Sequence, residues 1–216
     1  MLEIFQHSQF LYGVAVCAVV ALLIAGERAF FLGFRAHIAP EPFFAQVQRL
    51  VLEGRIDQAV RYCAAEPYAP LANVVRAALL HADASREDMA LAVEQAALDA
   101  VPAVQRRVAY LATIANVVTL IGLLGTIYGL ITAFDAVSGA NPEEKQNLLA
   151  HGIAIAMYTT AGGIAVAIPC LIAYAMLVQR GNAILDDTDR FGTRMLLLLR
   201  ARSAQVPEPA PGVAQP

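Results

Sequence analysis

The sequence predicts an all-α membrane protein with three transmembrane helices and long helical extensions into the cytoplasm. Two stretches of 27 residues, Val108–Phe134 and Gly152–Val178, contain no Asp, Glu, Lys or Arg. Each is longer than the roughly 20 residues that a helix needs to span a bilayer. The whole chain is 58% hydrophobic and only 15% charged, a composition that is unusual for a soluble domain.

The first predicted span lies near the start of the chain. An apolar run extends from Phe10 to Gly26 and is closed by Glu27 and Arg28. A secretory signal peptide is the alternative, but Met1–Gln9 carries no Lys or Arg and no small-x-small cleavage site follows the run. We therefore favour a retained transmembrane helix.

The distribution of Lys and Arg predicts the orientation of the chain. There are none before the first span, eight between the first and second spans, one (Lys145) in the loop Asp135–His151, and five after the third span. Cytoplasmic segments carry the excess of Lys and Arg. We expect the N-terminus and the Asp135–His151 loop outside, and the long intermediate segment and the C-terminus in the cytoplasm.

The intermediate segment is predicted to be helical. Apolar residues recur at helical spacing from Pro42 to Gly54, in Ile56–Ala65 and in Leu71–Leu80. Ser85 followed by Asp88 resembles a capping box at the start of a further helix.

From Arg86 the helical pattern continues almost unbroken into the second span, interrupted only by Pro102, which should kink it. Four prolines among the last ten residues predict that Ser203–Pro216 is a disordered tail. The expected segments are an extracytoplasmic N-terminus 1–9, first span 10–34, cytoplasmic domain 35–107, second span 108–134, outer loop 135–151, third span 152–178, cytoplasmic helix 179–202 and tail 203–216.

Small and hydroxylated residues are concentrated in the second and third spans. Such residues suit close helix packing or the lining of a polar path. They are Gly122, Gly125, Thr126, Gly129, Thr159, Thr160, Gly162, Gly163 and Pro169. The Gly125–Gly129 pair forms a GxxxG pattern, which indicates close helix contact but has little specificity. Pro169 is expected to kink the third span.

These motifs support a comparison with a known family. The run Gly122-Leu-Leu-Gly-Thr126-Ile-Tyr-Gly129, followed by Gly152-Ile-Ala-Ile-Ala and Thr159-Thr160-Ala-Gly-Gly, resembles the second and third membrane helices of the MotA/TolQ/ExbB proton channel family. MotA has four spans, so this three-span chain is more similar to the ExbB/TolQ branch. Members of that branch commonly have Pro where this chain has Thr119, and Glu in the third span where it has Ile155.

The resemblance implies a function and a set of partners. It implies a homopentameric ring in the bacterial inner membrane, surrounding a single-span ExbD/TolR-like partner that supplies a membrane Asp, with a TonB/TolA-like energy-transducing protein as a further candidate partner. Such a complex couples the flow of ions, either protons or sodium ions, to mechanical work on the cell envelope in transport, envelope integrity or motility. Thr126 and Thr160 match the family threonines that face the Asp, whereas Gly122, Gly125, Gly129, Gly163 and Pro169 would pack helices in the pore ring. The alternative for the threonines is a hydrogen bond to their own helix.

Two other classes of function remain open, a passive membrane scaffold and a solute transporter subunit. No catalytic constellation or nucleotide-binding motif is present, and no Cys/His spacing resembles a metal site. We therefore expect that the protein is not an enzyme and binds no cofactor, metal or nucleic acid. We interpret the three cysteines as isolated structural thiols.

Overall fold

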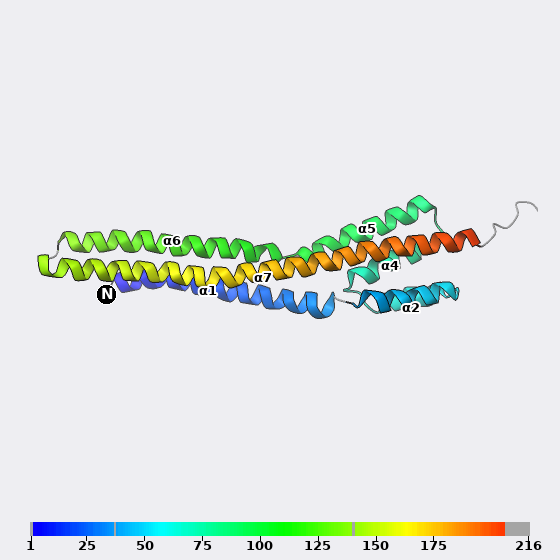
Figure 1. Ribbon diagram of the computed structural model, residues 1–216, viewed down its shortest axis with the longest axis horizontal. Coiled ribbons are helices and arrows are strands. Elements are labelled where there is room, and N and C mark those ends of the chain that lie inside the picture. Colours follow the sequence, from blue (N-terminus) through cyan, green and yellow to red (C-terminus); the bar gives the residue numbers. More distant parts are fainter. Residues whose placement is uncertain (1, 37, 140, 206–216) are drawn as a thin grey trace, which may run out of the picture. The chain divides into compact units, whose positions relative to one another are not determined.

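The computed structural model describes residues 2–36, 38–139 and 141–205, and every regular element within them is a helix (Figure 1). The elements are α1 (Leu2–Phe30), the π-helical segment η1 (Phe31–Arg35), α2 (Pro40–Leu52), α3 (Ile56–Ala64), α4 (Pro70–Leu80), α5 (Arg86–Gln105), α6 (Val108–Ser138) and α7 (Pro142–Gln205). Three helical stretches, within Phe10–Leu52, Arg86–Ser138 and Glu143–Arg202, are long and apolar enough to cross a membrane. The predicted fold class is confirmed.

The described chain divides into two compact units. Unit 1 comprises residues up to Phe30 together with Arg106–Gln179, and unit 2 comprises Phe31–Gln105 together with the residues from Arg180 onward. Helix α7 contributes its first part to unit 1 and its second part to unit 2.

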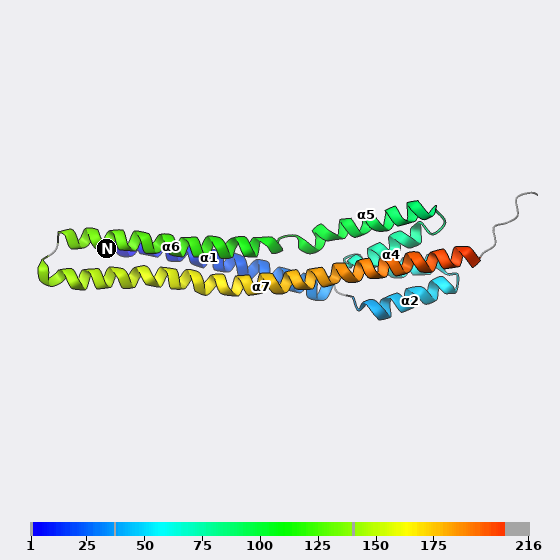
Figure 2. The same cartoon turned by 45° about the horizontal axis from the view of Figure 1, so that its top comes forward.

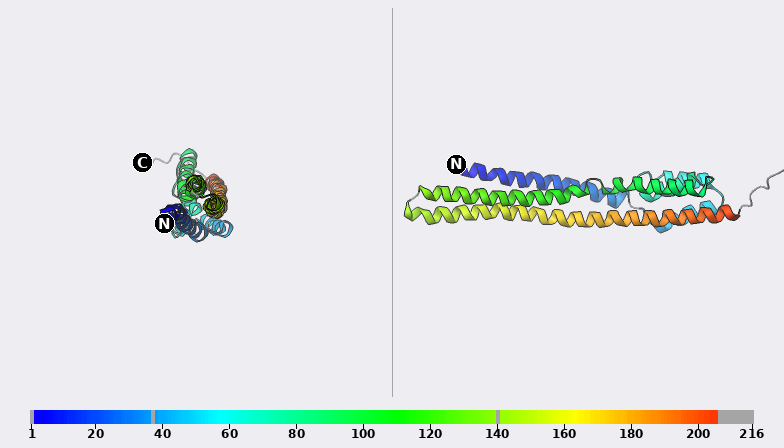
Figure 3. Two further views of the ribbon diagram at one scale, coloured as in Figure 1. Left: turned by 90° about the vertical axis from the view of Figure 1, so that its left-hand side faces the viewer. Right: turned by 90° about the horizontal axis from the view of Figure 1, so that it is seen from above.

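Unit 1 contains the three apolar runs. Helices α6 and α7 run antiparallel side by side, as both Figure 1 and Figure 2 show, and α1 packs along α6 (Figure 3). The residues that α6 buries are Val108, Leu111, Ala115, Val118, Gly122, Gly125, Gly129 and Ala133. Their spacing alternates between three and four as far as Gly129, a period of about 3.5 that keeps one seam facing a neighbouring helix. The residues buried in this seam are mainly Val and Leu near Arg107, and Gly and Ala near the loop between α6 and α7.

Unit 2 is built from η1, α2 to α5 and the second part of α7. Its core is centred on Phe191 and Met195 of α7, both fully buried, against Val47 of α2 and Val74 of α4. The predicted helices of this segment are confirmed, with starts and ends shifted by a few residues. Gly54 has φ +79°, a left-handed conformation that glycine adopts at little cost, and this explains the end of α2.

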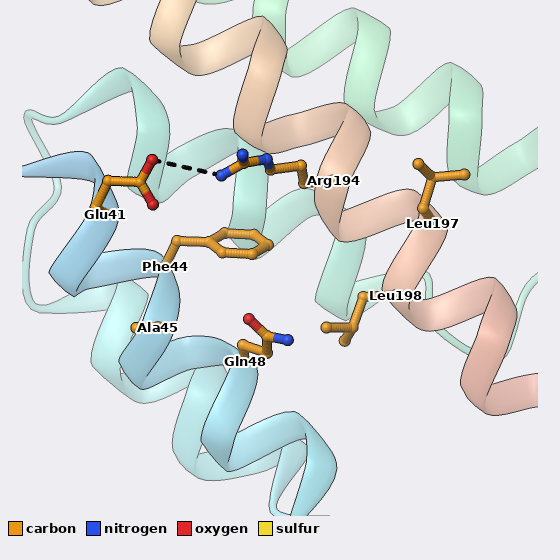
Figure 4. A pocket seen from close by; sticks show the side chains of 7 residues that line it. All are labelled: Glu41, Phe44, Ala45, Gln48, Arg194, Leu197 and Leu198. Carbon is orange, nitrogen blue, oxygen red and sulfur yellow. Dashed lines mark ion pairs between the residues drawn. The ribbon is translucent and has the colours of Figure 1, made fainter.

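A groove of about 360 Å³ lies on unit 2 between α2 and α7 (Figure 4). An ion pair of 3.5 Å joins Glu41 to Arg194 across it, and Phe44 packs against Phe191 with ring centroids 5.2 Å apart. Both charged side chains are substantially exposed, so this pair contributes little to stability.

The expected continuation of one helix from Arg86 into the second span was wrong. Pro102 lies within α5, and the break falls instead at Arg106 and Arg107. Arg107 has φ +65° and is the one non-glycine residue with positive φ among the described residues. Its Nη1 lies 2.8 and 2.9 Å from the two carboxylate oxygens of Glu27 on α1. This charge-assisted contact offsets part of the cost of a left-handed arginine.

Two further expectations concern the ends of helices. The Ser85–Asp88 capping interaction is present, because the Asp88 backbone N–H donates to Ser85 Oγ at 3.1 Å and Ser85 Oγ donates to Asp88 Oδ2 at 2.6 Å. Helix α7 continues to Gln205, so the first three residues of the expected tail are helical. The remainder of that tail, 206–216, lies outside the described residues.

Cys63 provides a chemical probe of unit 2. Burial raises the pKa of its thiol from 9.0 to about 12, against the opposing effect of the Arg76 charge. Because only the thiolate is nucleophilic, iodoacetamide at pH 8 should leave Cys63 unmodified in the folded protein. Peptide mass mapping before and after urea unfolding checks this. Modification of the native protein at the rate of a free thiol would show that Cys63 is accessible.

The same pKa shift has a consequence for stability. A thiol whose pKa is raised on folding stabilises the native state fully below pH 9.0, and this contribution is lost as the pH rises towards about 12. The midpoint of urea unfolding of unit 2 should therefore fall across that alkaline range, and less so in Cys63→Ala.

Candidate functional site

Glycines allow α6 and α7 of unit 1 to approach closely. A Cβ atom added at Gly163 would lie 2.9 Å from the Val118 carbonyl oxygen and 3.2 Å from Gly122 Cα. One added at Gly122 would lie 3.2 Å from the Thr159 carbonyl oxygen. The obstructing atoms belong to the backbone, which cannot rotate away as a side chain can. Backbone therefore meets backbone at this point of the seam.

Glycines also allow a close approach of α6 and α7 nearer to the loop that joins these two helices. A Cβ at Gly125 would lie 2.8 Å from Thr159 Oγ1, and one at Gly129 would lie 2.9 Å from Ala156 Cβ. Gly152 packs against Ala133 even more closely. The GxxxG pattern and the small residues of the third span predicted close packing of this kind. The specific partners Ala133 and Ala156 were not predicted, because alanine is common throughout these helices.

Two threonine hydroxyls meet across the seam. Thr160 Oγ1 on α7 lies 3.0 Å from the Gly122 carbonyl oxygen and 3.2 Å from Thr126 Oγ1 on α6. Thr126 Oγ1 lies 2.6 Å from the carbonyl oxygen of Leu123 in its own helix. Both side chains are half-buried. The structure thus brings together the two threonines that the sequence singled out, from residues 34 positions apart.

The hydrogen positions of this pair follow from its partners. A carbonyl oxygen only accepts, so the Thr126 hydroxyl donates to Leu123 and the Thr160 hydroxyl donates to Gly122 or is shared with Thr126. Both protons are directed to oxygen atoms of the protein. Each hydroxyl oxygen can therefore still accept a hydrogen bond, whereas its O–H group is already used as a donor.

Thr159 differs from its neighbour. Its side chain is fully buried against Gly125, and its Oγ1 donates to the Ala156 carbonyl oxygen at 2.7 Å. No surface of this side chain is available to another molecule. Thr159 therefore provides a control for the Thr126–Thr160 pair, with the same chemistry but a different environment.

Pro169 lies away from the glycine contact. It is exposed and lines a groove of unit 1 between α1 and α7, together with Ala165 and Cys170. Of the five residues that we expected to pack helices in a pore ring, the four glycines lie in the α6–α7 seam of a single chain.

The threonine pair lies in stretches of α6 and α7 that contain no charged side chain. Neither 108–134 nor 152–178 contains an Asp, Glu, Lys or Arg, and Ile155 stands one turn before Thr159 on α7. Unpaired polar groups are costly in the bilayer interior, and both hydroxyls have hydrogen-bond partners within the protein. The outward faces of α6 and α7 are apolar, with Leu123, Ile127 and Met157 at least half exposed.

Comparisons with known proteins cover the same region. A family model described as the MotA/TolQ/ExbB proton channel family matches residues 66–190. The chain is 44% identical to the Tol-Pal system protein TolQ of Haemophilus influenzae over 42% of this chain and 40% of TolQ. It is 43% identical to the biopolymer transport protein exbB1 of Vibrio cholerae over 27% of this chain and 25% of exbB1.

A longer match extends over nearly the whole chain. An ExbB-like 1 protein of Synechocystis is 27% identical over 98% of this chain and 83% of its own length. The matches to TolQ and exbB1, in contrast, span less than half of those proteins.

Proposed function

The chain belongs to the MotA/TolQ/ExbB proton channel family, and we propose that it is the ring-forming subunit of a proton-driven motor in the bacterial inner membrane. In this proposal the subunit binds a single-span partner of the ExbD/TolR type, and proton passage at their contact drives movement of the partner. A TonB/TolA-like protein would transmit that movement to the cell envelope.

The observation that carries this proposal is the Thr126–Thr160 hydroxyl pair in a part of the membrane helices without charge. This chain offers no carboxylate in those stretches, so the titrating group has to come from the partner. A protonated carboxyl group of the partner needs an acceptor for its O–H. The two threonine oxygens are such acceptors, because their own O–H groups donate to backbone carbonyl oxygens.

The same pair can serve the ionised carboxylate after one rotation. Turning a hydroxyl from its carbonyl oxygen towards the partner converts the threonine from an acceptor into a donor. The carbonyl oxygens of Gly122 and Leu123 each accept a helical N–H from four residues later, so neither loses its last partner. The site therefore accommodates both protonation states without leaving a buried polar group unpaired, which is what a group that gains and loses a proton in each cycle requires.

Assembly follows from the apolar surface of unit 1. Large apolar side chains at least half exposed cover α1, α6 and α7, among them Tyr12, Leu22, Leu120 and Met157. We propose that copies of the chain associate through part of this surface into a homopentamer, as the family resemblance implies, with α6 and α7 lining the central pore and α1 outside. The N-terminus lies outside the cytoplasm and the C-terminus inside.

The experiment that tests this function is a proton-flux assay. The chain is co-expressed with a single-span partner that has an Asp early in its membrane helix, and the purified complex is reconstituted in vesicles containing a pH-sensitive dye. We expect flux for the complex, and loss of flux when the partner Asp is replaced by Asn. A second experiment in cells uses an uncoupler, which collapses the proton gradient. If the function of the complex in cells were unaffected by the uncoupler, the complex would be a passive scaffold and the proposal would be wrong.

A further inference from the structure

An apolar groove of about 320 Å³ lies on unit 1, between α1 and α7 and beside α6. All of its walls are apolar, and half of the lining residues are alanines. On α1 it extends from Ala18 to Ala25, about 10 Å at 1.5 Å per residue. Its length and its apolar lining suit an extended hydrocarbon chain.

One end of the groove lies next to a cluster of charges. Ala25 is three residues before Arg28 on α1, and Leu111 is four residues after Arg107 on α6. Both helices therefore place an arginine about one turn beyond the last groove residue. The contact between Arg107 and Glu27 shows that these two helix positions lie at the same level.

The cluster has an excess of positive charge. It contains Arg28, Arg106 and Arg107, against the single carboxylate of Glu27. Arg28 has a side chain only 7% exposed, and the charges of Arg106 and Arg107 are near enough to repel it. Arg106 is exposed and forms no ion pair within the part of the chain that the structure describes. An anion at this position would relieve the repulsion.

We infer that this groove binds an anionic phospholipid, with one acyl chain between α1 and α7 and the phosphate at the arginine cluster. The apolar walls accept the chain, and the guanidinium groups donate charge-assisted hydrogen bonds to the phosphate oxygens. The cluster lies where the apolar runs of α1 and α6 end, which is the depth of lipid headgroups. In the orientation proposed above this is the cytoplasmic leaflet.

The test is native mass spectrometry of the purified, assembled complex titrated with phosphatidylglycerol or with phosphatidylcholine of the same acyl chains. We expect phosphatidylglycerol to be retained in preference. In Arg106→Gln its apparent affinity should fall about tenfold, the effect of losing one charge-assisted hydrogen bond. Arg86→Gln removes an exposed arginine from unit 2 and should leave the affinity unchanged.

A second pair of variants tests the groove itself. Ala165 is exposed and lines the groove, and Ala165→Leu should narrow the groove and reduce retention of both lipids. Ala161→Leu adds the same bulk at an exposed position one turn earlier that does not line the groove, and should have no effect. Equal lipid retention in Arg106→Gln and Arg86→Gln would overturn the inference. So would an altered subunit number in Ala165→Leu with lipid retention unchanged, since the groove would then be a contact between copies.

Discussion

Replacing Gly163 with alanine should separate α6 from α7 and destabilise unit 1 by about 1–3 kcal/mol, the usual cost of forcing an extra group into a packed contact. The new Cβ would lie 2.9 Å from the Val118 carbonyl oxygen and 3.2 Å from Gly122 Cα. Because both obstructing atoms belong to the backbone, the contact is relieved only by moving one helix. The thermal midpoint of the purified protein and its yield of assembled complex measure the effect.

The matched control is Gly162→Ala, one residue earlier on the same helix. A Cβ at Gly162 would meet only Leu11 Cδ2, at 3.8 Å, an ordinary contact with a side chain that can adjust. The two variants have the same change in helix propensity, so a difference between them reports the seam alone. Equal stability of the two variants would show that the α6–α7 contact is wider than the structure indicates.

Charge-free runs and helical periodicity predicted the helices, and the family resemblance singled out the helix pair that carries the candidate site. The charge-free runs defined the membrane helices, because a bilayer imposes a length and a composition on them. The spacing of Gly122, Gly125 and Gly129 predicted a close contact, because small residues on one face of a membrane helix let the backbone of a neighbouring helix approach.

The helix break before the second span could not be predicted in this way. Sequence pattern favoured Pro102, the stronger local helix breaker, yet the break falls at Arg107. Its side chain contacts Glu27, a residue 80 positions away in the sequence. Likewise, a pattern of small residues shows that a face packs closely but does not show that Gly152 meets Ala133. Long-range partners are determined by the register of two helices, which local sequence does not specify.

Replacing Thr160 or Thr126 with valine should slow the proton cycle without preventing assembly. Valine keeps the shape of threonine and removes the hydroxyl, so the partner carboxyl group loses a hydrogen-bond partner at a cost of roughly 1–3 kcal/mol, or about 5- to 150-fold in rate. The measurement is partner-dependent proton flux in vesicles that contain verified complex. Ile155→Val, at the position where the family commonly has Glu, should have a smaller effect.

The two variants should differ in stability, and this difference separates function from packing. Thr160 donates to the Gly122 carbonyl oxygen on the other helix, whereas Thr126 donates within its own helix. Thr160→Val should therefore lower the free energy of unfolding by about 1 kcal/mol, while Thr126→Val should leave it nearly unchanged and affect flux alone. Thr159→Val removes a buried hydroxyl that also bonds its own helix, at 2.7 Å, and should retain full flux. Full flux in both Thr126→Val and Thr160→Val would identify these threonines as packing residues and exclude them from the ion path.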